Sequence, residues 1–161
     1  MDIKRLRDIL RYDPETGVFT WKEPQSPRLP AGAVAGYFVS RGYRQIQIDK
    51  VKHREHRLAW AYVYGEWVDS IDHIDGCVSN NSIENLRPAT LSQNQHNRKL
   101  GKNNTSGFKG VSFCKRSKKW KGTIRLRGKP IHVGLFETAE AANEAVCKER
   151  ERLHGEFANH G

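Results

Sequence analysis

The sequence predicts an α+β protein made of two small units, and three observations support this prediction. A chain of 161 residues is long enough for one ordinary domain or two small ones. β-prone runs bounded by turn residues are followed by helical patterns twice along the chain. Between the two sets lies a polar segment without apolar residues, 101–106 (GKNNTS). We therefore expect units at 1–100 and 107–161, joined by a linker at 101–106.

The first unit is expected to combine short helices with a small antiparallel sheet. Apolar residues at helical spacing predict an amphipathic helix over 2–12, and a β-prone run at 18–21 predicts a hairpin or a single strand. Alternating residues in 37–51 predict two strands joined by a turn at Asp49-Lys50. The following segment, 53–68, has helical periodicity with Gly65 as its terminator.

Side chains on this second helix have ordinary structural interpretations. Its aromatic residues are expected in or near the core, because aromatics at helical spacing usually pack; they are Trp60, Tyr62, Tyr64 and Trp67. His53 and His56 lie three positions apart in a basic segment. We expect surface or phosphate-contacting roles for them in preference to metal binding.

The second unit is expected to have two layers. β-prone runs around 111–113, 120–126 and 131–135 are separated by turn signals and predict three antiparallel strands. A helix follows, with Thr138 as its N-cap and Gly155 at its end. The helix covers one face of such a sheet. The other face carries basic residues and remains open, as expected for a sheet that lies in a DNA groove.

The composition favours a polyanionic partner. Twenty-eight Lys and Arg against eighteen Asp and Glu give a formal net charge of +10 and a sequence pI near 9.7. No apolar run approaches membrane-spanning length and no signal-peptide pattern follows Met1. We expect a soluble, cytoplasmic protein that binds nucleic acid and no membrane. Three cysteines without a CxxC pair argue against both a disulfide framework and a cysteine-type zinc site.

The segment 72–98 carries the candidate chemistry. Asp72 and Asn94 offer oxygen atoms that a hard divalent cation prefers, and His73 is suited to taking a proton from water near neutral pH. A strand at 70–74, a turn at Asp75-Gly76 and a helix after Thr90 are expected around them. A strand residue and a helix residue can then meet over one ion.

This segment resembles the HNH endonucleases through DHIDG, NN, IENLR and a helix with NxxN, and in particular the phage homing endonucleases. The resemblance implies a β-hairpin packed on a helix around one metal ion, Mg²⁺ or Mn²⁺. It implies Asp72 and Asn94 as metal ligands, His73 as general base and Asn85 as the residue that braces the loop and orients His73 through backbone hydrogen bonds. His96 is an alternative for the last motif position, and Asn97 lies beside it. Arg87, Arg98 and Lys99 are expected phosphate contacts.

The segment 107–158 resembles the DNA-binding domain of plant ethylene-response factors, the apetala family, through FKGV, KWKGTIR, HVGLF, ETAEAA and LHGEFA. The resemblance places DNA contacts at Lys109, Ser112, Cys114, Thr123, Arg125, Pro130 and His132. Ser112, Cys114 and Pro130 cannot make the bidentate guanine contact of an arginine, so the plant target sequence is not expected to transfer. Lys115, Arg116, Lys121 and Arg127 are expected to contribute affinity. Trp120 is expected to pack.

Together these features predict a metal-dependent, site-specific DNA endonuclease of the homing type. Its partner is double-stranded DNA, no small-molecule cofactor is expected, and the protein acts as a monomer or a homodimer, in an infected bacterial host. Two alternatives remain: a DNA-binding regulator whose nuclease unit is inactive, and a basic RNA-binding protein.

Overall fold

The computed structural model describes residues 1–97, 100, 103–126 and 128–160, without the side chains of residues 95 and 96. The predicted contacts of Arg98, Lys99 and Arg127 and the alternative role of the His96 side chain therefore lie outside the described residues. Contacts between Cα atoms divide the chain into Met1–Thr90, called unit 1, and Leu91–Gly161, called unit 2. This division falls before the boundary expected after residue 100, because the helix that follows Thr90 packs within unit 2. Each unit is described by itself.

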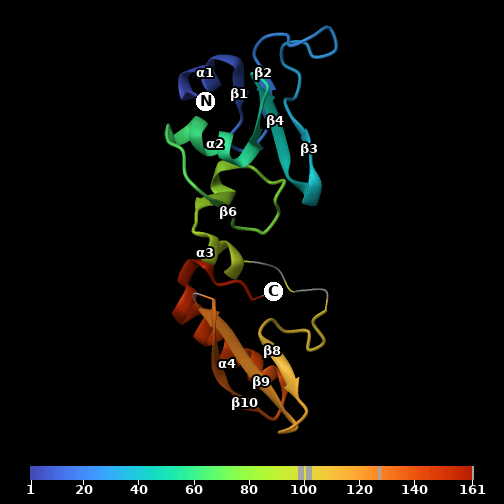
Figure 1. The fold of residues 1–161 in the computed structure, drawn as a ribbon, viewed down its shortest axis with the longest axis vertical. Coiled ribbons are helices and arrows are strands. Elements are labelled where there is room, and N and C mark those ends of the chain that lie inside the picture. The colour runs from blue at the N-terminus through green and yellow to red at the C-terminus, as the bar shows by residue number, and fades with distance from the viewer. Residues whose placement is uncertain (98–99, 101–102, 127, 161) are drawn as a thin grey trace. The chain divides into compact units, whose positions relative to one another are not determined.

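Unit 1 contains three small antiparallel sheets and two α-helices (Figure 1). In chain order its elements are α1 (Ile3–Ile9), β1 (Leu10–Tyr12), β2 (Phe19–Trp21), β3 (Tyr37–Phe38), η1 (Ser40–Gly42), β4 (Arg44–Ile48), β5 (Val51–Arg54), α2 (Glu55–Tyr64), β6 (Ile71–His73), η2 (Ile83–Asn85) and β7 (Leu86–Pro88). The sheets are β1-β2, β3-β4-β5 and β6-β7.

Helix α1 ends earlier than the sequence predicts. Asp2 caps it, but the helix stops at Ile9, and Leu10 is already extended with φ −121° and ψ 148°. The expected helix over 2–12 is therefore wrong in its last turn. Pairing of Leu10 with Trp21 and of Tyr12 with Phe19 buries all four side chains in a sheet, which outweighs local helical periodicity.

The turns of unit 1 follow the prediction. Asp49 and Lys50 both have positive φ, 47° and 66°, as a two-residue hairpin turn between β4 and β5 requires. Gly65 ends α2 in the left-handed conformation with φ 74°. The hairpin and the helix end are thus confirmed.

The core of unit 1 is built from α1, α2 and all three sheets, with Leu6, Phe19, Ile46 and Leu58 fully buried. Trp60 is also buried and Tyr62 packs against the core, as expected. Tyr64 is 54% exposed, but its ring lies 4.1 Å from the ring of buried Trp60, so it is near the core. The prediction is wrong for Trp67, which is 38% exposed. Tyr64 is the last residue of α2 and Trp67 follows its Gly65 cap, so helical periodicity no longer sets the direction of Trp67.

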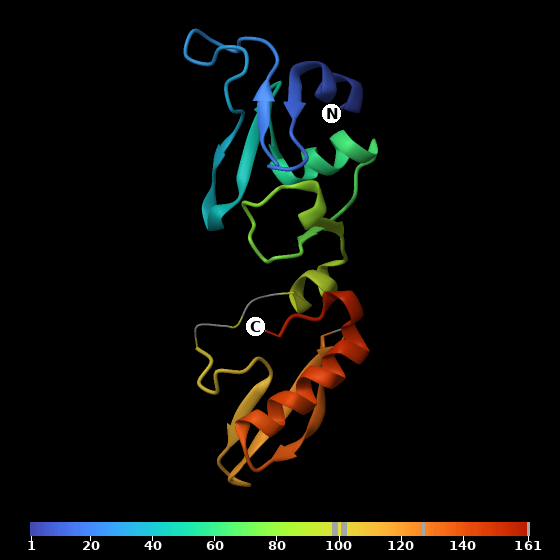
Figure 2. The same ribbon diagram turned by 180° about the vertical axis from the view of Figure 1, so that it is seen from behind.

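Unit 2 has the predicted two-layer fold. Its elements are α3 (Leu91–His96), β8 (Val111–Cys114), β9 (Lys119–Leu126), β10 (Lys129–Phe136), α4 (Ala139–His154) and η3 (Gly155–Phe157). The antiparallel sheet has the order β10-β9-β8, and α4 lies across one of its faces (Figure 2). The Thr138 hydroxyl accepts the amide of Ala141 at 3.1 Å, which confirms the predicted cap. The expected α+β class is confirmed.

The sheet of unit 2 fits closely under α4. Gly122 allows this approach, because a Cβ there would lie 2.8 Å from a methyl carbon of Val146. Ile124 is buried on the same side, whereas Lys121 and Arg125 are exposed. This alternation leaves a basic sheet face uncovered by α4. Among the described helices, none is long and apolar enough to cross a membrane.

Candidate active site

The candidate site is built on the hairpin β6-β7. Asp72 pairs with Arg87 and His73 with Leu86, and the amide of Ile74 donates to the carbonyl of Asn85 at 2.9 Å. Asp72 and His73 are 7% and 5% exposed. A rigid, buried strand therefore presents two neighbouring polar side chains, whose orientation depends on the groups around them.

Asp72 is held by an arginine from the partner strand. Arg87 donates from Nε at 3.0 Å and from Nη2 at 2.8 Å, both to Oδ2 of Asp72. Both side chains are largely buried in this ion pair. The pair orients the carboxylate and partly offsets its charge. Arg87 was expected to contact phosphate, and the structure places its guanidinium on Asp72.

His73 belongs to a buried chain of side-chain hydrogen bonds. Its Nε2 lies 3.1 Å from Oδ1 of Asn81, and Nδ2 of Asn81 donates to Oε2 of Glu55 at 2.9 Å. The same carboxylate oxygen accepts Nε of Arg44 at 2.6 Å, and Arg44 also donates to the carbonyl of Ala35 at 2.9 Å. Glu55 is 0% and Asn81 1% exposed, so the two central groups of this chain are closed to solvent.

The chain determines which nitrogen of His73 carries the proton. A carboxylate oxygen that accepts Arg44 requires a donor from Asn81, so the amide nitrogen faces Glu55 and the amide oxygen faces His73. Nε2 of neutral His73 then donates to Asn81, and Nδ1 carries the lone pair. This is the tautomer of a histidine whose Nδ1 accepts a proton.

Burial favours the neutral form of His73. Burial lowers the pKa of His73, while the hydrogen bond to Asn81 and the charges of Asp75 and Asp72 oppose this shift. The His56 ring lies 5.1 Å from the His73 ring, and burial, followed by His73 and the neighbouring arginines, lowers the pKa of His56 to about 3. Both imidazoles are therefore neutral near pH 7, and a neutral imidazole can act as a base.

Asn85 braces the loop that follows His73. Its Oδ1 accepts the amide of Asp75 at 3.0 Å, and its Nδ2 donates to Oδ1 of Asp75 at 3.0 Å and to the carbonyl of Asn80 at 2.8 Å. Asn80 in turn donates from Nδ2 to Oδ2 of Asp75 at 2.8 Å. Asn85 thus fixes loop 75–80, whereas the side chain on the His73 ring comes from Asn81.

The N-terminal part of unit 1 holds the backbone around Asn81 in place. The Tyr12 hydroxyl donates to the carbonyl of Asn81 at 2.7 Å, and the amide of Ile83 donates to the carbonyl of Pro14 at 2.9 Å. Gly17 has φ +72°, and a Cβ there would lie 2.3 Å from the carbonyl carbon of Asn81. The turn between β1 and β2 therefore helps to position the site.

Asn81, Glu55 and Arg44 were not assigned to the site from the sequence. Asn81 was counted with Asn80 in the NN of the motif, but no role in the site was given to it. Glu55 carries a usable signal, because it is the one acidic residue in the basic segment 52–57 (KHREHR). Arg44 carries no such signal in the sequence, since it stands among the alternating residues of a strand.

The donor chemistry of the expected metal ligands fits a hard divalent cation. Asp72 supplies a carboxylate and Asn94 an amide oxygen, and Mg²⁺ takes one or two protein oxygens together with water and substrate. Among the described residues, no group of three or more His, Cys, Asp or Glu could hold a metal ion. Asn94 lies on α3 in unit 2, so its pairing with Asp72 stays a prediction.

Asn97, a further candidate from the motif, has a structural partner within unit 2. It is 6% exposed, and Nδ2 of Asn159 donates to both its carbonyl and its Oδ1 at 2.9 Å. This contact ties the end of α3 to the C-terminal chain. A catalytic role for Asn97 stays a prediction.

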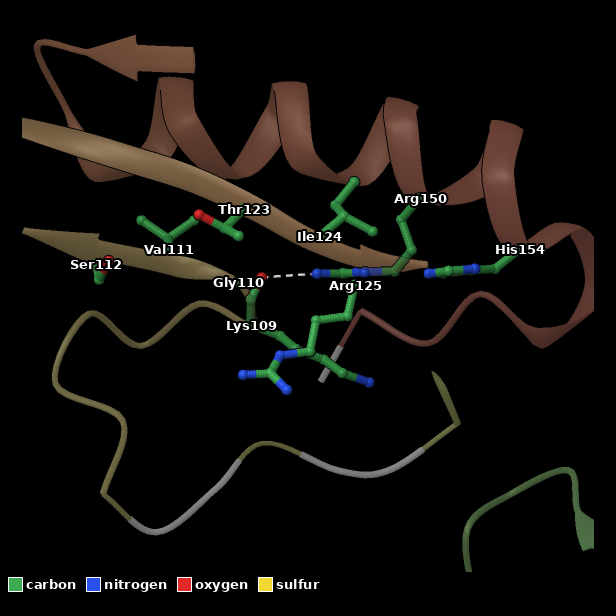
Figure 3. Close-up of a pocket in the computed structure, with 9 residues that line it drawn as sticks. All are labelled: Lys109, Gly110, Val111, Ser112, Thr123, Ile124, Arg125, Arg150 and His154. Carbon is green, nitrogen blue, oxygen red and sulfur yellow. Dashed lines mark hydrogen bonds between the residues drawn. The ribbon is translucent and has the colours of Figure 1, made fainter. Parts of the chain in front are cut away.

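The expected DNA-contacting residues of unit 2 differ in accessibility. Lys115, Arg116, Lys121, Arg125 and His132 are exposed, and Thr123 is partly buried. Lys109 is half-buried, with Nζ donating to the carbonyl of Asn159 at 3.0 Å. Burial and the nearby Arg150 lower the pKa of Lys109 to about 8. Figure 3 shows the Arg150 guanidinium against the backbone at Lys109, where Nη2 donates to the Lys109 carbonyl at 2.6 Å.

Comparison with known proteins identifies the class to which this site belongs. The model of the HNH endonuclease family matches residues 53–96, the segment that holds α2, Glu55, Asp72, His73 and Asn81. Residues 53–96 therefore form an HNH endonuclease domain, a type of nuclease unit that acts on DNA.

A curated relative extends this assignment. Protein 3.8 of Escherichia phage T7 is 40% identical over 88 residues, which cover 55% of this chain and 72% of the relative. The chain belongs to the same family as that phage protein. No solved structure matches the chain. The resemblance of unit 2 to the ethylene-response-factor domain stays a prediction.

Proposed function

We propose that the protein is a metal-dependent, site-specific DNA endonuclease of the homing type, with His73 as general base. The observation that supports this role best is the hydrogen-bonded chain Arg44–Glu55–Asn81–His73. This chain orients the buried imidazole of His73 and leaves the lone pair on Nδ1. Orientation by a buried carboxylate–amide pair would be superfluous for a histidine that only fills the core.

In this proposal, Nδ1 of His73 takes a proton from a water molecule as the water oxygen attacks phosphorus. The new P–O bond forms as the bond to the leaving oxygen breaks; that oxygen takes a proton from solvent water, and His73 afterwards returns its own proton to solvent. Asp72 and Asn94 would hold a divalent ion, Mg²⁺ or Mn²⁺, which when bound supplies charge stabilisation for phosphate and leaving oxygen. Arg87 fixes the direction of the Asp72 carboxylate.

Unit 2 is proposed to select the DNA. Its sheet exposes Lys121, Arg125 and His132 opposite α4, and Lys115 and Arg116 lie in the turn before β9. A basic antiparallel sheet of this kind can enter a DNA groove. Because each chain has one His73, a monomer nicks one strand per engagement, and a double-strand break requires a dimer or two successive events.

Incubation of purified protein with supercoiled plasmid and Mg²⁺ or Mn²⁺ tests the proposal. We expect conversion to nicked circles, abolished by EDTA and by His73→Ala, with one main set of DNA ends upon sequencing. Intact plasmid across several target libraries and salt concentrations, with DNA binding preserved, would instead identify a DNA-binding regulator with an inactive nuclease unit. Stronger binding to RNA than to duplex DNA would refute the DNA substrate.

A further inference from the structure

A basic cavity lies on unit 1, outside the hydrogen-bonded chain that orients His73. It has a volume of about 360 Å³ and is lined by Met1, Lys52, His53, Arg54, Arg57 and Trp67. Strand β5 supplies three of these residues, α2 supplies Arg57, and Trp67 follows the end of α2. The edge of a sheet and the side of a helix thus converge on one cavity.

The charge of the cavity fits an anion. Lys52, Arg54 and Arg57 are cationic, and in the described part of the chain none of them forms an ion pair. Buried Nη1 of Arg54 has no hydrogen-bond partner among the described residues. Burial lowers the pKa of His53, and the positive charge of Arg57 adds to this effect. Such a site has positive potential without a protein carboxylate to neutralise it.

One wall of the cavity is aromatic and holds a guanidinium in place. The Arg57 guanidinium lies 6.0 Å from the centre of the Trp67 ring, and its Nη2 donates to the carbonyl of Val68 at 3.2 Å. The His53 ring lies 6.3 Å from the same indole. Trp67 is 38% exposed, although a tryptophan is costly to leave in water. A positioned cation beside a flat apolar surface suits a phosphate and its attached sugar or base.

The cavity is close to His73. The Arg54 guanidinium lies 5.0 Å from the centre of the Tyr43 ring, and the Tyr43 ring lies 6.1 Å from the His73 ring. These two distances place the guanidinium no more than about 11 Å from His73. Since one DNA strand carries a phosphate about every 3.4 Å along the axis, this separation spans at most about three phosphates.

We propose that the cavity lined by Lys52, His53, Arg54, Arg57 and Trp67 is a DNA backbone site that holds a phosphate within about three nucleotides of the bond at His73. The inference rests on the proposed function for the position of that bond, but the cavity binds the backbone whether or not cleavage follows. Lys52 and Arg57 contact the phosphate, and Trp67 covers the adjacent sugar or base. The contact holds the strand in register with His73 independently of unit 2.

The salt dependence of DNA binding tests this site. The variant Lys52→Gln/Arg57→Gln is compared with Arg11→Gln/Arg28→Gln, which removes two exposed positive charges from unit 1 outside the cavity. Binding to a duplex is measured without metal, so that no cleavage occurs. The slope of log K against log salt is negative, with a magnitude of about 0.9 per phosphate contact. We expect this magnitude to decrease by about 1–2 for the cavity variant and to change little for the control. Circular dichroism confirms that both variants fold.

Phosphate-ethylation interference then locates the contact. With wild-type protein, ethylation within about three nucleotides of the cut should weaken binding, and this effect should be absent in the cavity variant. Equal slopes for the two double variants would overturn the site, whatever the cleavage result. If wild-type protein fails to nick DNA while the cavity variant still loses slope, the backbone site stands and the proposed endonuclease activity fails. A slope change seen with RNA alone would also overturn the proposal.

Discussion

The two units differ in how they use polar side chains. Unit 1 buries Glu55, Asp72, His73, Asn81 and Asn85, whereas the described part of unit 2 buries only Asn97 and Arg150 among its polar and charged residues. Unit 2 instead exposes lysine and arginine on a sheet face whose other side packs on α4. Reaction chemistry requires side chains in one orientation, and burial provides it. Backbone and groove binding requires accessible charge, which a surface provides.

The same difference predicts where substitutions act. A buried hydrogen-bonded group leaves its partner unsatisfied when it is removed, which costs about 1–3 kcal/mol and more for a charge. An exposed cation contributes little to folding, but its loss reduces affinity for DNA. Substitutions in the site of unit 1 should therefore impair stability or turnover, and those on the sheet of unit 2 should impair binding alone.

The substitution His73→Ala is expected to have the largest effect, a loss of DNA cleavage. Loss of a general base should reduce the nicking rate by about 10²–10⁴-fold, while DNA affinity stays within about twofold because the imidazole acts on water. Single-turnover nicking and gel-shift titration measure the two quantities. A parallel loss of affinity and rate would show that His73 contacts DNA and would remove its assignment as base.

The next effect concerns folding. Glu55→Ala should lower the free energy of unfolding of unit 1 by about 3–5 kcal/mol, because Arg44 and Asn81 lose a buried partner. Glu144→Ala, which removes an exposed ion pair with Lys148 on α4, should leave unfolding nearly unchanged. Denaturant titration followed by tryptophan fluorescence compares them. Similar stability of both variants would contradict the contrast between the units.

A smaller effect is expected where a backbone contact positions Asn81. Gly17→Ala combines a positive φ with a clash against the Asn81 backbone and should destabilise unit 1 by about 1–3 kcal/mol. Gly32 has φ +82° but open space around it, so Gly32→Ala isolates the conformational cost. We expect the nicking rate of folded protein to fall for Gly17→Ala alone. Equal rates for the two variants would show that the β1-β2 turn does not position the site.

The substitution Arg125→Ala in unit 2 is expected to have the smallest effect on the folded protein. Folding should be unchanged, and binding to the target should weaken by about 1–3 kcal/mol if Arg125 contacts a base. If Arg125 contacts phosphate, all sequences should weaken alike and the salt slope should fall by about 0.9. Titrations with target and scrambled duplexes over a salt series distinguish these results. Unchanged binding to both duplexes would remove Arg125 from the interface.

Much of the architecture could be predicted because its causes are local. Alternation at Ile46 and Ile48 predicted a strand, Asp49-Lys50 predicted its turn, and Thr138 with Gly155 predicted both ends of α4. Local rules failed at Leu10, where helical periodicity continued but pairing with Trp21 placed the residue in a strand. They failed again at Trp67, which lies beyond the helix whose period was used.

The sequence by itself determined the turn at Asp49-Lys50, the end of α2, both ends of α4 and, through resemblance, the Asp72-His73 pair and the asparagines of the motif. Only the tertiary structure decided that Asn81 bonds His73, that Glu55 bonds Asn81 across 26 positions, and that Tyr12 reaches Asn81 across 69. Turns and caps depend on the backbone preferences of a few neighbouring residues, which the sequence displays directly. A buried polar atom takes whichever partner the fold brings within hydrogen-bonding distance, so its partner is known only once distant segments have packed together.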